Sequence, residues 1–149
     1  MKTAAAIVLG LIPLIVGADK YLLAVRRKNG YKTLKQDINA AYSRAKTVHS
    51  DLPEMFLGTA FLSFANNDCQ INTREFEKYG LDSSDIETVS ALVNSIKRGD
   101  TAAVNDGFSA ALSQIEEKGR AAQEYLKTTA AMYLKVSLAV AAAVFLIII

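Results

Sequence analysis

The sequence holds very little of the chemistry that catalysis and metal binding usually require. Its 149 residues include one cysteine, Cys69, one histidine, His49, and no tryptophan. A single cysteine excludes an internal disulfide framework, and a single histidine excludes metal sites built on two histidines. Glycine-rich phosphate-binding motifs are also missing. We therefore expect no catalytic residues, no metal site, no cofactor and no small-molecule substrate, and a protein that is not an enzyme.

Proline, net charge and strand-like patterns are scarce as well. The only prolines are Pro13 and Pro53, so no proline interrupts a helix after residue 53. A net charge of +2 is too small for a general nucleic-acid binder, and no basic and aromatic motif of such proteins is present. No alternating apolar pattern of useful length appears. These absences favour an all-α protein that does not bind nucleic acid.

Long uncharged stretches are present at both ends of the chain. Residues 3–18 and residues 136–149 contain no charged side chain. As helices they would measure about 24 and 21 Å, slightly less than the ~30 Å hydrocarbon core of a bilayer. Lys20 and Lys135 can extend toward the interface and allow each span to be longer. We expect transmembrane helices in segments 1–25 and 131–149, around a helical domain of residues 26–130.

Four cations follow the first uncharged stretch, Lys20, Arg26, Arg27 and Lys28, whereas one lysine precedes it. Positive residues close to a membrane span stay on the cytoplasmic side. The pattern predicts a protein of the cell membrane, in contact with its lipid, with both termini outside and the central domain in the cytoplasm. Lys135 is expected to mark the same boundary on the second span.

A second interpretation of the N-terminal stretch stays open. A short basic start, an apolar run and the small residues of Val16-Gly17-Ala18 are also typical of a cleaved signal peptide. In that case the protein is exported and held by its C-terminal segment as a membrane anchor. Export would carry the four cations across the membrane, which favours the retained helix.

The first and last helices of the central domain are expected to pair. Asn29-Gly30 indicates a break, and the helix after it has a narrow apolar seam, at Leu34, Ile38, Ala41, Ala45 and Val48. The last helix begins at Asp100 or Thr101 and has its own apolar stripe, at Val104, Phe108, Ala111 or Leu112, Ile115, Ala122 and Leu126. Since both helices continue into the membrane, we expect an antiparallel stalk packed like a coiled coil.

Shorter helices are expected between these two. Asp51-Leu-Pro-Glu54 predicts a helix start, and the apolar segment 55–65 after it is either the centre of the domain or a docking surface. The candidate partner surface consists of four residues, Met55, Phe56, Phe61 and Phe64. Caps at Asn72 and Ser84 predict two more helices, which end at Gly80 and at Lys97-Arg98-Gly99.

Three stretches resemble a known family. They are RRKNGYKTLKQDINAAYSRAK (residues 26–46), DLPEMF (residues 51–56) and the closing helix AAQEYLKTTAAMYLKVSLAVAAAVFLIII (residues 121–149). They are similar to the basic start, the Pro-Leu-Pro-Glu-Ala-Leu stretch and the terminal helix of the stage III sporulation protein AB family of endospore-forming bacteria, relatives of the assembly-platform domains of type II secretion and type IV pilus systems. The resemblance implies a non-enzymatic scaffold or adaptor of the transenvelope complex between mother cell and forespore, with its domain in the mother-cell cytoplasm beside the ATPase of that complex.

Overall fold

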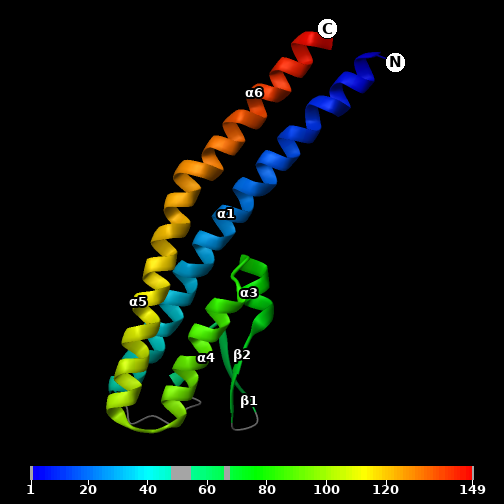
Figure 1. Ribbon diagram of the computed structural model, residues 1–149. Coiled ribbons are helices and arrows are strands. Elements are labelled where there is room, and N and C mark those ends of the chain that lie inside the picture. The colour runs from blue at the N-terminus through cyan, green and yellow to red at the C-terminus, as the bar shows by residue number, and fades with distance from the viewer. Residues whose placement is uncertain (1, 48–54, 66–67, 149) are drawn as a thin grey trace. The chain divides into compact units, whose positions relative to one another are not determined.

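The computed structural model describes residues 2–47, 55–65 and 68–148, and of these the side chains of residues 2–10, 47, 64, 65, 68 and 148 are not described (Figure 1). The described chain is mostly helical. Its elements are, in order, α1 (Lys2–Thr47), β1 (Leu62–Ala65), β2 (Asp68–Ile71), α3 (Thr73–Tyr79), α4 (Ser83–Lys97), α5 (Thr101–Tyr125), the π-helix η1 (Leu126–Ala130) and α6 (Ala131–Ile148). They form two compact units, a paired-helix unit of residues 1–28 and 121–149 and a central unit of residues 29–120.

Helix α1 passes through Asn29-Gly30 without interruption, so the predicted break is wrong. Gly30 is buried, and a Cβ atom at this position would lie 2.6 Å from the Cβ of Tyr79. The glycine thus permits a close approach of the last residue of α3, rather than a turn. Glycine inside a helix costs roughly 1 kcal/mol of stability relative to alanine. The buried contact between Gly30 and Tyr79 offsets this cost.

Within the central unit, α1 and α5 are antiparallel. Tyr42 stacks on Phe108 with ring centroids 4.8 Å apart, and Lys35 Nζ lies 3.2 Å from Glu116 Oε2. The contact positions therefore rise along α1 as they fall along α5. Six buried residues belong to the predicted seams, Leu34, Ile38 and Ala41 on α1, and Phe108, Ala111 and Ile115 on α5. Tyr31 of α1 is also buried, although it lies outside the predicted seam.

The segment predicted as a helix over 55–65 has a different structure. Turns lead from Phe56 through Gly58, whose φ is +77°, into a two-stranded antiparallel hairpin in which Leu62 of β1 faces Ile71 of β2. Asp37 of α1 holds the entry to β1, because its Oδ2 accepts hydrogen bonds from the backbone N–H groups of Ala60 at 2.7 Å and Phe61 at 3.1 Å. The helix start predicted at 51–54 lies outside the described residues.

The aromatic residues of this segment lie in the core. Phe61 is fully buried and packs edge-on against Phe76 of α3, with ring centroids 4.9 Å apart. Met55 and Phe56 are 7 % and 3 % exposed. These three residues therefore offer no docking surface, because their side chains are already covered. The side chain of Phe64, the fourth candidate, lies outside the described residues.

Helix α3 begins and ends where the sequence predicts, but its start is held differently. Gly80, with φ of +67°, ends it in a left-handed conformation. Asn72 is the N-cap residue and makes no side-chain cap bond, since its Nδ2 donates instead to the Ala60 carbonyl at 3.3 Å. Asn72 therefore ties α3 to the turn before β1.

Gly99, with φ of +72°, follows the end of α4 as predicted.

The paired-helix unit packs through small residues. Gly17 is buried, and a Cβ atom there would lie 3.4 Å from the Tyr133 carbonyl oxygen and would overlap the side chain of Ser137. Ala24, Ala130 and Ala141 are also buried. Figure 1 shows the beginning of α1 beside the end of α6, so the two helices are antiparallel in this unit. Small residues let the two backbones approach closely.

A π-helical segment, η1, joins α5 to α6. A π-turn accommodates one residue more than an α-turn, because its hydrogen bonds span five residues. Ala130, the last residue of η1, and Ala141 of α6 are buried, whereas Tyr133, Val136 and Val140 remain about half exposed. The segment thus determines which face of α6 lies in the pair.

Candidate functional site

The outer surface of the paired-helix unit is apolar. Large hydrophobic side chains that are 45–83 % exposed follow both helices, Leu11, Ile12, Ile15, Val16, Leu22 and Leu23 on α1, and Met132, Val136, Leu138, Val140, Phe145, Leu146 and Ile147 on α6. In the part of the chain that the structure describes, one helix, Thr101–Ile147, is long and apolar enough to cross a membrane, and 6 % of its most apolar stretch is buried. The side chains of residues 2–10, which belong to the first predicted span, lie outside that part.

Two of the cations predicted to lie next to the membrane, Lys20 and Lys135, border this apolar surface. Lys20 follows Gly17 by three residues, and Lys135 lies between Tyr133 and Ser137, the two residues that Gly17 faces. Both lysines are exposed and lie at the same level of the pair. The described parts of the uncharged stretches, residues 3–18 and 136–148, therefore run side by side beyond this level (Figure 1).

The next level of charge lies further along the two helices. Arg26 and Lys127 are exposed, and Arg27 and Lys28 are half-buried. Glu124 is the acid at this level, and it is exposed. The apolar surface therefore ends at a band in which cations outnumber acids.

The central unit contains a buried carboxylate that the sequence did not reveal. Asp85 is fully buried and belongs to the start of α4. The sequence predicts Ser84 as the N-cap of α4, but the N-cap is Asp82. Asp82 Oδ1 accepts a hydrogen bond from the Asp85 N–H at 3.2 Å, and Asp85 Oδ2 accepts one from the Asp82 N–H at 2.9 Å. Ser84 instead donates its hydroxyl to Asp82 Oδ1 at 2.6 Å. This reciprocal capping box fixes the position of the Asp85 side chain.

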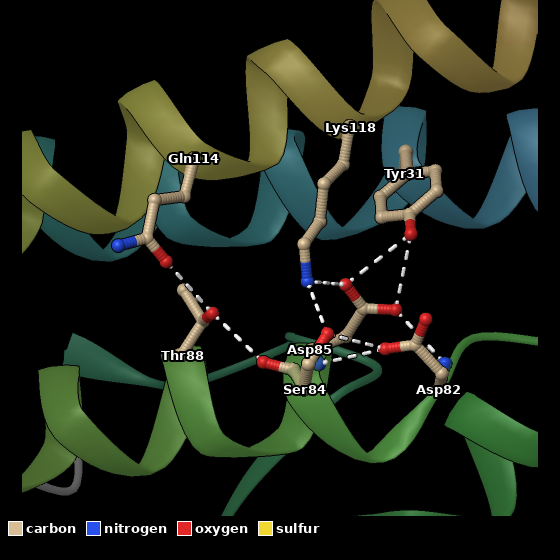
Figure 2. A network of polar contacts seen from close by, with 7 residues as sticks. All are labelled: Tyr31, Asp82, Ser84, Asp85, Thr88, Gln114 and Lys118. Atoms are coloured by element: carbon tan, nitrogen blue, oxygen red, sulfur yellow. Dashed lines mark hydrogen bonds and ion pairs between the residues drawn. The ribbon is translucent and has the colours of Figure 1, made fainter.

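Asp85 joins three helices of the central unit (Figure 2). Lys118 of α5 lies 2.7 Å from Asp85 Oδ1, and the Tyr31 hydroxyl of α1 lies 3.1 and 3.2 Å from the two carboxylate oxygens. Lys118 also donates to the Ser84 hydroxyl at 2.6 Å. A buried charge is tolerated when it is paired and hydrogen-bonded, and Asp85 satisfies both conditions.

These contacts make the buried carboxylate a structural group. Three donor groups share the two oxygens of Asp85, the Tyr31 hydroxyl, the Asp82 N–H and the Lys118 ammonium, and the side chain is fully buried. One turn further along α4, the Thr88 hydroxyl donates to Gln114 Oε1 of α5 at 2.9 Å. We call Tyr31, Asp85 and Lys118 the polar clamp of the central unit, since they connect α1, α4 and α5.

Ion pairs on the surface shift the pKa values of two further groups, Glu116 and Lys78. Arg120 donates to Glu116 Oε1 at 3.1 Å, and this bond, together with Lys35, lowers the pKa of the Glu116 carboxyl. The hydrogen bond from Lys78 to Glu75 raises the pKa of the Lys78 ammonium. Both pairs are exposed, and exposed pairs contribute little to stability.

The single cysteine and the single histidine are the other candidate residues for chemistry. Cys69 is half-buried on β2, and His49 lies outside the described residues. Within the described ranges, no group of three or more His, Cys, Asp or Glu residues could hold a metal ion.

Comparisons with known protein families, with curated proteins and with solved structures found no match in any of the three. The function is therefore inferred from the two features described above, the apolar paired helices and the clamped central unit.

Proposed function

We propose that the protein is a non-enzymatic adaptor tethered to the cell membrane at both ends. In this proposal α1 and α6 cross the bilayer as an antiparallel pair, and the central unit lies in the cytoplasm as a platform on which other protein subunits dock. The resemblance to the stage III sporulation protein AB family supports the docking role, a place in a transenvelope complex and a cytoplasmic ATPase as partner.

The observation that carries the proposal is the distribution of side chains in the paired-helix unit. Helix pairs in water bury their large apolar residues and expose polar ones. This unit does the opposite, since Gly17, Ala24 and Ala141 are buried while Ile15 and Leu146 are 65 % and 80 % exposed. Such a surface is stable in lipid, where close packing of small residues holds helices together.

The lengths of the two helices also fit a bilayer. Residues 3–25 and 128–149 would extend about 34 and 33 Å as helices, enough for a ~30 Å hydrocarbon core. Lys20 and Lys135 then lie near one interface, where their long stems can carry the charge to the headgroups. Pro13 is compatible with this span, because transmembrane helices tolerate proline.

The cations give the orientation. Arg26, Arg27 and Lys28 follow the first span directly, and the rule that positive flanks remain inside assigns this side to the cytoplasm. Since α1 and α6 are antiparallel, the same side receives the start of the second span. The chain is then held twice, which limits tilt and rotation of the helices that enter the central unit.

Labelling of single cysteines tests the topology. Replacing Cys69 by Ser leaves a chain without cysteine, into which Ser109→Cys, on an exposed position of α5, is introduced. We expect a membrane-impermeant maleimide to label this cysteine only after the cells are permeabilised. An Ala142→Cys variant, exposed on α6 within the apolar stretch, is the matched control and should resist labelling in intact membranes. Labelling of Ser109→Cys in intact cells would refute the cytoplasmic placement.

The mass of the purified full chain distinguishes the alternative. An intact N-terminus agrees with a retained first span, whereas a chain that begins at Asp19 would indicate a cleaved signal peptide and an exported protein with one anchor.

A further inference from the structure

The two units carry net charge of opposite sign. Residues 1–28 and 121–149 contain seven Lys or Arg and two Asp or Glu, a net charge of +5, whereas residues 29–120 contain ten and thirteen, a net charge of −3. Together they give the +2 of the whole chain. A chain that is almost neutral therefore concentrates its positive charge on the unit with the exposed apolar surface.

The positive charge lies where this apolar surface ends. Arg26 and Arg27 are contributed by α1 and Lys127 by η1, so both members of the antiparallel pair supply cations. Arg26 lies about 14 Å beyond Gly17 along its helix, at 1.5 Å per residue. By the same rise, Lys127 lies about 9 Å before Tyr133, on the same side of the contact. The two exposed cations thus belong to the same band of the pair.

We propose that this band binds the headgroups of anionic phospholipids and selects them over zwitterionic ones. The inference rests on the proposed membrane function and specifies its lipid partner. Guanidinium and ammonium groups donate strong hydrogen bonds to phosphate oxygens, and an anionic leaflet attracts cations that lie next to a membrane span. The central unit has a net negative charge, so an anionic lipid surface does not attract it.

Competitive lipid binding tests the proposal. The full chain is placed in micelles that contain equal amounts of phosphatidylglycerol and phosphatidylcholine, and retained lipids are counted by native mass spectrometry. We expect phosphatidylglycerol to predominate. The double variant Arg26→Gln/Lys127→Gln should lower this preference by about 5- to 25-fold, since each cation near an anionic surface contributes about fivefold.

A matched variant removes two cations from the central unit. Lys97→Gln/Arg98→Gln changes the net charge by the same amount at exposed positions at the end of α4. We expect its lipid preference to stay within about twofold of the wild-type chain, because these residues lie outside the paired-helix unit. High salt should reduce the wild-type preference through screening. The proposal would be overturned if the wild-type chain retained the two lipids equally. It would also be overturned if both double variants lost the preference for phosphatidylglycerol to the same extent.

Nucleic acid is the competing partner for a band of cations. A short DNA duplex added in excess should leave the retained phosphatidylglycerol unchanged. If the duplex binds the chain and displaces the lipid, the cations bind nucleic acid and the lipid proposal is refuted.

Flotation separates this proposal from the membrane function itself. Chain that stays with phosphatidylcholine vesicles after an alkaline carbonate wash is inserted, and if it shows no lipid preference, only the lipid proposal is refuted. Chain that floats with anionic vesicles alone, and is released by salt, refutes the two-span tether while supporting recognition of anionic lipid.

Discussion

Replacement of Asp85 by Asn removes the charge at the centre of the polar clamp while preserving the shape of the side chain. Removing one partner of a fully buried ion pair costs about 3–5 kcal/mol. Asp85 is fully buried, but the Lys118 side chain is 31 % exposed and can recover part of its hydration. The amide oxygen of Asn also keeps one hydrogen bond. We therefore expect a loss of about 2–3 kcal/mol in the free energy of unfolding of the central unit.

Hydrogen exchange of the α4 amides measures this loss in the full chain in micelles. A destabilisation of 2–3 kcal/mol corresponds to exchange that is about 30- to 150-fold faster where opening of the central unit limits protection. Glu87→Gln removes a carboxylate from an exposed position of the same helix and should change exchange by less than about threefold. If Asp85→Asn behaves like this control, the clamp does not stabilise the unit.

A double-mutant cycle isolates the ion pair itself. Lys118→Met leaves the carboxylate buried with two neutral donors, the Tyr31 hydroxyl and the Asp82 N–H. The double variant Asp85→Asn/Lys118→Met should lose less stability than the sum of the two single variants, by about 1–2 kcal/mol, because the second change no longer leaves a charge unpaired. Additive effects would show that the two groups are not coupled.

Three further changes test contacts elsewhere in the central unit. Gly30→Ala should destabilise it by about 1–3 kcal/mol, since the new methyl group overlaps an α3 side chain; Gly119→Ala, where the nearest contact is an ordinary 3.4 Å, should be neutral or stabilising when both are compared by thermal unfolding. Asp37→Asn should increase exchange of the two amides that enter β1 about fivefold, since it weakens charge-assisted hydrogen bonds, and unchanged exchange would contradict that role. The pKa of Glu116 is lowered by Arg120, so its contribution is present above the ordinary pKa of 4.5 and lost as pH falls through the lowered value. Glu116→Gln should remove this part of the acid sensitivity of the melting temperature, and an unchanged pH profile would refute it.

The parts of the fold that the sequence predicts are those with local causes. The left-handed glycines after α3 and α4, the start of α5 at Thr101 and the apolar seams of α1 and α5 follow from residues close to one another in the chain. Caps, stops and helical periodicity act within a few residues, so they can be recognised without the tertiary structure.

The parts that the sequence misses depend on distant partners. The sequence predicts a helix break at Gly30 because the contact that requires a glycine there, the approach of Tyr79, comes from a residue 49 positions away. The strands of the hairpin have four residues each, too few for a clear alternation, and Asp37 of another element helps to hold them. Tertiary contacts override local propensity at both places.

Asp85 gives a partial signal that could have been used. It follows Asp82 by three residues, the spacing of a capping box, and it precedes Val89 and Leu92 by four and seven residues, which places it on the apolar face of α4. A carboxylate on an apolar face requires a cation partner. Lys118, 33 residues away, could not be identified as that partner from spacing alone.

The extra residue in η1 has a consequence for how α6 can move. If residues 126–130 changed from π to α hydrogen bonding with the chain length unchanged, every residue after them would turn by roughly 100° about the helix axis. Tyr133 and Val140, now about half exposed, would rotate toward α1, with Val140 taking the place of Ala141. Deleting one residue from the segment would instead give a regular helix with the present face retained. A change in the hydrogen bonding of this short segment would thus twist the whole of α6 about its axis without bending it.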